Sequence, residues 1–241
     1  MLAVESLLYP LLTELILIKG ARYFQFERVG DLLENKKHRT RLEVDLSAIA
    51  QNLHQYKSSL KPKTKLMVMV KAFSYGAGSF EIANLLQYSH VDYIAVAYAD
   101  EGVELRRAGI RTPIMVMNTE EESFSSIVSY NLEPELYSNS STKAFIEFLS
   151  REAITHYPVH LKLDTGMHRL GFEEENLDEL ILVLKENTSV SVKSILSHLA
   201  TSDALEQQDF ARFQIALFEK MTSKLLRELQ INPIRHILNT S

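Results

Sequence analysis

The sequence predicts an α/β fold, a (β/α)8 barrel of parallel strands joined by crossover helices, which is incomplete in this chain. Three observations predict it. Strand-like and helix-like stretches alternate, seven strand centres lie between residues 68 and 238, and the 241 residues are close to the length of such a barrel. A closed barrel has eight strands. We therefore expect the chain to be a fragment, with an eighth strand beyond Ser241.

Periodicity justifies the individual elements. Apolar runs predict strands at residues 14–20, 41–46, 65–71, 91–98, 113–118, 132–138, 158–165, 192–200 and 234–241. A helical apolar period predicts helices over 79–88, 100–109, 176–187 and 207–229. The second of these helices ends at Gly109, and glycine is a common helix stop.

The first residues predict a separate unit. Residues 31–40 are polar and charged, and the composition changes across them. We expect residues 1–36 to be the last strand and helix of another unit, and residues 37–241 to be the barrel. The longest uncharged run near the start, residues 6–13, is far short of the roughly 20 residues that span a membrane.

Composition excludes several classes of function. A net charge of −5 leaves no basic field for a polyanion, so we expect no nucleic-acid partner. The absence of cysteine excludes disulfides and thiolate metal sites, and fits a reducing compartment. No pair of histidines has the spacing of a known metal motif, so we expect no metal.

The stretch KLMVMVKAFSYGAGS, residues 65–79, places Lys71 at the end of a strand that is predicted to be buried. Burial disfavours the ammonium form. A neutral amine there could form a Schiff base with an aldehyde such as that of pyridoxal phosphate. The residues alone leave open a lysine that reaches the barrel rim or pairs with a carboxylate. Tyr75 could donate its hydroxyl to a phosphate or to a structural partner.

Other polar residues follow later strands. They are candidates because the active site of a (β/α) barrel lies at the carboxyl ends of its strands. Arg169 has a planar guanidinium group that could bind the carboxylate of a ligand, but it could equally well form an ion pair on the surface. His198 is compatible with a ligand contact or with a core position. A triad of His198 with Ser197 and Asp164 is disfavoured, because adjacent strand residues point to opposite faces. A buried Lys162 must pair, become neutral or be modified.

Taken together, the strings LEVDLSAIAQNL, MVKAFSYGAG, HLKLDTGMHRLGF, SHLATSD and HILNTS resemble alanine racemase, a pyridoxal-phosphate enzyme with an N-terminal barrel. The resemblance covers about residues 40–241. Upstream, ELILIKGARYFQFERVGDLLE is similar to the C-terminal end of the muramyl ligase that adds D-alanyl-D-alanine to the cell-wall precursor. The whole therefore resembles a ligase–racemase fusion that is cut inside both partners.

The resemblance implies a role for each candidate residue. Lys71 would be the Schiff-base lysine and the base on one face of the substrate. The phosphate would be bound by Tyr75, Asn239 and Thr240, the last of which stands where the family usually has serine.

Around the cofactor ring, the resemblance implies that Arg169 lies beside the ring oxygen and the substrate carboxylate, and that His198 lies near the ring. Lys162 matches a position that can be carbamylated. His168 stands where the family usually has glycine.

The implied function is the interconversion of L-alanine and D-alanine in the cytoplasm, which supplies peptidoglycan synthesis. The full-length enzyme would be a homodimer. The second catalytic base would lie on a C-terminal domain beyond this chain, so we expect the fragment alone to be inactive. Two alternatives stay open: a barrel that only carries pyridoxal phosphate, and a decarboxylase of the same fold that acts on a basic amino acid.

Overall fold

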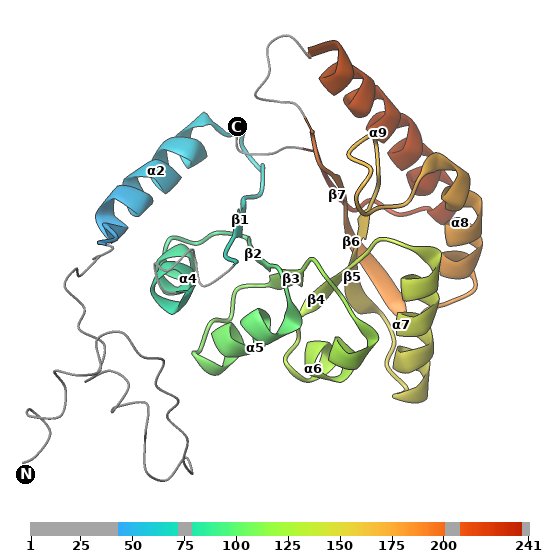
Figure 1. Cartoon of the computed structure of the whole chain (residues 1–241), viewed down its shortest axis with the longest axis horizontal. Coiled ribbons are helices and arrows are strands. Elements are labelled where there is room, and N and C mark those ends of the chain that lie inside the picture. The colour runs from blue at the N-terminus through green and yellow to red at the C-terminus, as the bar shows by residue number, and fades with distance from the viewer. Residues whose placement is uncertain (1–42, 72–78, 201–207, 238–241) are drawn as a thin grey trace, which may run out of the picture. The chain divides into compact units, whose positions relative to one another are not determined.

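Seven parallel strands form one sheet in sequence order, in a computed structural model that describes residues 43–71, 79–200 and 208–237. The strands are β1 (Met67–Met69), β2 (Tyr93–Val96), β3 (Ile114–Val116), β4 (Glu133–Leu136), β5 (Tyr157–Lys162), β6 (Val190–Ser197) and β7 (Ile234–Ile237). The sheet curves into a half-barrel with helices along its outer side (Figure 1). The prediction of an incomplete α/β barrel with seven strands is confirmed.

The connections between the strands are helical. The helices are α2 (Leu46–Ser59), α4 (Ser79–Tyr88), α5 (Ala99–Arg107), α6 (Phe124–Ser129), α7 (Asn139–Arg151), α8 (Leu177–Lys185) and α9 (Gln208–Leu229), with short 3-10 turns η2 (Glu121–Ser123) and η3 (Glu174–Asn176). The four predicted helices are confirmed to within two residues at each end. None of the helices in the described part of the chain combines the length and the apolarity needed to cross a bilayer.

The strand predicted at residues 41–46 is wrong over its described part. Asp45 is instead the N-cap of α2, where its Oδ1 accepts hydrogen bonds from the backbone N–H groups of Ser47 (2.8 Å) and Ala48 (3.1 Å). An aspartate at this position satisfies N–H groups that have no partner within the helix. The strand predicted at 14–20 and the unit predicted at 1–36 lie outside the described residues.

The two faces of the sheet differ in chemistry because side chains alternate along each strand. One face is apolar and packs against the helices in the main core; it includes Ile94, Val96, Ile114, Val116, Leu136 and Leu161. The inner face carries a small apolar cluster of Ala95, Met115 and Leu196. It also carries buried polar side chains, among them Glu135, His160 and Lys162. The chemistry of the fold is therefore concentrated inside the half-barrel.

Candidate active site

The segment after β5 leaves the strand and returns to it. Asp164 donates its backbone N–H to the Phe172 carbonyl (2.9 Å), and Phe172 donates its own to the Lys162 carbonyl (2.8 Å). Gly171 makes this return possible. Its φ is +139°, and a Cβ there would lie 2.5 Å from the backbone nitrogen of Asp164.

Asp164 organises the start of the same loop. Its Oδ1 accepts hydrogen bonds from the backbone N–H groups of Gly166 (2.8 Å) and His168 (3.1 Å). His168 has a φ of +50°, a conformation in which glycine has no steric penalty. The loop holds His168 and the next residue, Arg169, as exposed side chains beyond the carboxyl end of β5.

The carboxyl end of β6 is fixed to the end of β5. The buried Ser197 hydroxyl donates to the Leu163 carbonyl (2.8 Å) and lies 2.8 Å from the Thr165 hydroxyl. From α9, the fully buried Gln214 donates to the His198 carbonyl (3.1 Å) and accepts from the Ala200 N–H (2.9 Å). Ser197 is thus engaged by β5, in agreement with the sequence argument against a hydrolase triad.

Sequence reasoning missed Gln214. Its amide also donates to the Thr165 hydroxyl after β5 (3.4 Å), so it binds the ends of two strands, and its position in the regular apolar period of α9 gives no sign of this.

His198 is half-buried, and three cations act on its imidazole. Burial lowers the pKa of His198, and the charges of Arg169, Lys162 and Lys71 lower it further. These cations come from separate strand ends or loops, yet each is close enough to affect the same ring. The positive charges of Lys71, Lys162 and Arg169 thus all act on one imidazole, and their assignment to a common active site stays a prediction.

The expectation that Lys71 is buried is wrong. Its side chain is exposed, and Met69, which precedes it on the same face, is 39% exposed. The reason is the position of β1. Within the described sheet, β1 is the first strand and pairs with β2 alone, so its end lacks a neighbour on one side. The other predicted cofactor residues, Tyr75, Asn239 and Thr240, lie outside the described residues.

Lys162 is buried, and of the three alternatives for it the structure shows pairing. Its Nζ lies 2.9 Å from Oε1 of Glu135 on β4, and the two side chains are 6% and 0% exposed. Burial raises the pKa of Glu135, and the charges of Lys162 and Arg169 oppose that rise. Carbamylation of Lys162 stays a prediction.

Sequence reasoning also missed Glu135, although a signal was present. Glu133 and Glu135 alternate on β4, while His160 and Lys162 alternate on β5. Each carboxylate reaches one basic partner, since Glu133 Oε2 lies 3.0 Å from His160 Nε2. Matching alternation of acidic and basic residues on neighbouring strands places both sets on one face.

A second polar group continues from His160 across the inner face. His160 Nδ1 lies 2.7 Å from the Ser194 hydroxyl, which in turn lies 3.3 Å from His236 Nε2. Burial, together with the neighbouring His160, lowers the pKa of His236 to about 4. Burial and the charge of Glu133 raise the pKa of Tyr93 to about 12. Both shifts favour the uncharged form of the side chain, the imidazole of His236 and the phenol of Tyr93.

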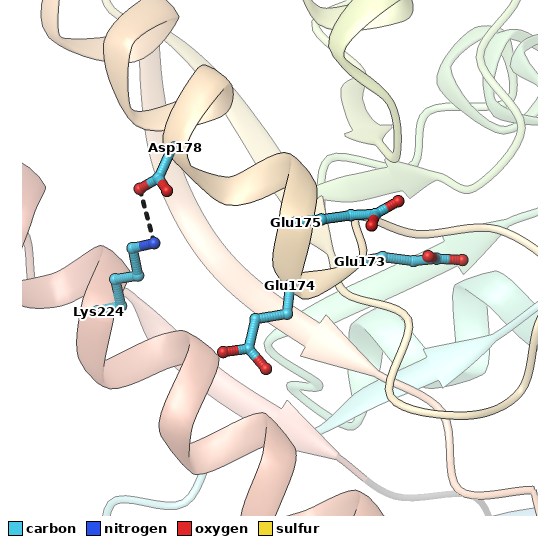
Figure 2. Close-up of a pocket in the computed structure, with 5 residues that line it drawn as sticks. All are labelled: Glu173, Glu174, Glu175, Asp178 and Lys224. Carbon is cyan, nitrogen blue, oxygen red and sulfur yellow. Dashed lines mark ion pairs between the residues drawn. The ribbon is translucent and has the colours of Figure 1, made fainter.

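Two further groups contain acidic side chains, one in the loop after β5 and one between η3, α8 and α9. Possible ligand atoms of Asp164, His168 and Glu173 come within 4.8 Å of one another, but the backbone N–H groups named above already occupy one oxygen of Asp164. A pocket of about 460 Å³ lies between η3, α8 and α9. Figure 2 shows the residues that line it: Glu173, Glu174, Glu175, Asp178 and Lys224. Lys224 pairs there with Asp178 at 2.6 Å. We assign no site to either group.

Known proteins share this fold and this region of sequence. Residues 44–241 match the family described as "Alanine racemase, N-terminal domain". An alanine racemase from Nostoc sp. is 33% identical over 190 residues, which are 75% of this chain and 49% of that protein. The solved alanine racemase of Clostridium difficile 630 has a TM-score of 0.75 at 30% identity, covering 81% of this chain and 54% of its own.

A histidine racemase from Leuconostoc mesenteroides has a TM-score of 0.71 at 28% identity, covering 80% of this chain and 50% of its own. The chain thus spans about half the length of the relatives that it matches. From the match over residues 44–241, together with the seven-stranded half-barrel, we conclude that the chain belongs to the family of alanine racemase N-terminal domains.

Proposed function

We propose that the chain forms the cofactor-binding barrel of a racemase that interconverts L-alanine and D-alanine with pyridoxal phosphate. One observation carries the proposal: Lys71, Lys162 and His198 stand at or just beyond the carboxyl ends of β1, β5 and β6 in one parallel sheet, and Arg169 lies in the loop after β5. The charges of the three cations act on the imidazole of His198. Such a concentration of positive charge at the carboxyl ends of parallel strands suits a ligand with a phosphate and a carboxylate. The names of the relatives support alanine as the substrate.

The side chains of Lys71 and Arg169 have the chemistry that racemisation requires. Racemisation requires removal of a proton from one face of the reacting carbon and its return to the other face. The amine of Lys71 is exposed, so it can bind the cofactor and accept the proton on its own face. The guanidinium of Arg169 is also exposed and can bind the substrate carboxylate through two parallel hydrogen bonds. Bound pyridoxal phosphate would supply an electron-poor ring that stabilises negative charge on the reacting carbon.

The remaining parts of the proposal follow from the family alone. Tyr75, Asn239 and Thr240 would bind the phosphate. The protein would act in the cytoplasm as a homodimer and supply D-alanine for peptidoglycan. Because a structural relative is named a histidine racemase, the substrate test includes histidine beside alanine.

Covalent trapping tests the cofactor and its lysine without requiring turnover. The chain is mixed with pyridoxal phosphate, reduced with borohydride, digested and mapped by mass spectrometry. We expect one dominant label, on Lys71, because hydride reduction fixes the cofactor irreversibly on the amine that holds it. The variant K71A should lose the label and the yellow colour.

Lys65 provides a matched control, since it is an exposed lysine just before the other end of β1. The variant K65A should keep full labelling of Lys71. Labelling spread over surface lysines, or unchanged in K71A, would contradict the proposal. On protein that turns over, formation of D-alanine or D-histidine would support a racemase, and release of carbon dioxide from lysine or ornithine would indicate a decarboxylase.

A further inference from the structure

Side chains connect the carboxyl ends of β5 and β6. The Ser197 hydroxyl donates to the Leu163 carbonyl (2.8 Å) and lies 2.8 Å from the Thr165 hydroxyl. Two candidate site residues follow these ends directly, Arg169 in the loop after β5 and His198 next after β6. A group that fixes the two strand ends therefore also limits where these residues can lie.

Gln214 on α9 joins the same strand ends from the outer side of the sheet. Its side chain is fully buried. Nε2 donates to the His198 carbonyl (3.1 Å) and to the Thr165 hydroxyl (3.4 Å), while Oε1 accepts from the Ala200 N–H (2.9 Å). Both ends of the amide are thus used, and each of its partners belongs to a strand end and not to α9.

These partners require an amide at position 214. A backbone carbonyl only accepts a hydrogen bond, and a backbone N–H only donates one. Glutamine offers a donor and an acceptor together, whereas an ionised glutamate cannot donate and a lysine cannot accept. The partners also fix which end of the amide is the nitrogen. The chemistry of Gln214 is therefore matched to the backbone of the residues around His198.

The two hydroxyls continue from this amide in one direction. The single proton of the Ser197 hydroxyl points to the Leu163 carbonyl, which can only accept. The proton between the two hydroxyls is therefore that of Thr165, whose oxygen accepts in turn from Gln214. Because Thr165 and Ser197 are both buried and each has a donor and an acceptor role filled, the group is satisfied and rigid.

We propose that Gln214 is a positioning residue, whose amide holds the backbone of His198 against the end of β5 and so determines where the His198 imidazole lies. In one respect this rests on the proposed function, which assigns His198 and Arg169 to the cofactor and the substrate. Gln214 acts through His198 and does not itself need to reach a ligand. Helix α9 thereby contributes to the site through two strand ends.

NMR titration of His198 tests the proposal on the full 241-residue chain, without cofactor or substrate. Loss of a resonance in H198Q assigns the imidazole. In the wild type, burial lowers the pKa of His198, and the charges of Arg169, Lys162 and Lys71 lower it further. Q214M keeps the length of the side chain but removes its donors and its acceptor. We expect the His198 midpoint to rise in Q214M toward the ordinary value of 6.5, since a released ring moves into water and away from these charges.

Thr222 provides a matched control on the same helix. It is fully buried, and its hydroxyl donates to the Phe218 carbonyl of α9 itself (2.7 Å). T222V therefore removes a buried hydrogen bond that belongs to α9 alone. We expect T222V to lower the free energy of unfolding and to leave the His198 midpoint where it is in the wild type.

A His198 midpoint in Q214M that is unchanged or lower would overturn the proposal. An equal rise in Q214M and T222V would also overturn it, because a general loosening of α9 would then explain both. Should Q214M not fold, Q214N replaces it, since an amide withdrawn by one carbon cannot reach all three partners and the same rise is expected. Failure of the proposed function would show separately, as the absence of cofactor labelling at Lys71.

Discussion

At the scale of single residues, Gly171 is the position where the site loop is most sensitive to one added carbon. Alanine there would have to adopt a φ of +139° and place its Cβ 2.5 Å from the Asp164 nitrogen and 2.7 Å from the Leu163 carbonyl carbon. Backbone atoms cannot move aside as a flexible side chain can. We expect G171A to lower the free energy of unfolding by about 3 kcal/mol, from the left-handed backbone and the overlap together.

Gly109 is the matched control for this prediction. Its φ is +93°, but a Cβ there would meet nothing within 4 Å. G109A should therefore lower the free energy of unfolding by about 1 kcal/mol, the cost of the left-handed backbone conformation alone. Urea unfolding of both variants measures the difference. Equal losses would mean that the close return of the loop to β5 does not require glycine.

At the scale of elements, the start of α2 depends on one carboxylate. Asp45 caps two N–H groups of the first turn, and no acidic residue stands in that turn to replace it. D45A should lower the free energy of unfolding by about 1 kcal/mol, whereas D45N should have little effect because asparagine also caps helices well. Urea unfolding and helix content by circular dichroism check both variants. A loss in D45N as large as that in D45A would assign the effect to charge instead of capping.

The same cap shows why sequence reasoning succeeded for some elements and failed for others. Helices with a clear apolar period were predicted to within two residues at each end, as with α4 (Ser79–Tyr88), while the predicted strands at 158–165 and 192–200 end three residues beyond β5 and β6. Before Asp45, Leu42 and Val44 alternate with charged residues, a pattern that predicts a strand, whereas Asp45 caps the helix that the structure shows there. Helices α6 and α7 were not predicted. Both begin with serine-rich sequence, such as NSSTK in α7, which interrupts the apolar period of a helix.

The candidate site was predictable in part for a similar reason. Lys71, Arg169 and His198 were singled out as polar residues at strand ends, and the charges of Lys71 and Arg169 act on the imidazole of His198. The exposure of Lys71 depends on the lack of a strand beside β1 in the described sheet, which no local pattern encodes. Glu135 can be recognised as part of the site only by comparing β4 with β5, because its contribution is the ion pair with Lys162.

At the scale of the whole molecule, the half-barrel encloses polar chemistry that a change of pH can disturb. His236 on β7 is held uncharged by burial and by His160, with Ser194 as its hydrogen-bonding neighbour. Its pKa is about 4 in the folded chain, against 6.5 as the ordinary value. Between these values the unfolded chain binds more protons than the folded chain, so stability falls as the pH falls. Below about pH 4 both states are protonated and the loss is complete.

The pH dependence of unfolding therefore has a component that belongs to this one imidazole. Between pH 7 and pH 4.5 we expect the wild-type free energy of unfolding to fall further than that of H236Q, by on the order of 2 kcal/mol after allowance for partial exposure. Carboxylates shared by both chains cancel in this comparison. His54 is an exposed histidine on α2, so H54Q should follow the wild-type curve. If the free energy of unfolding of the wild type and of H236Q changed in parallel with pH, the prediction would be contradicted. The charged imidazole of His236 would then be tolerated inside the barrel.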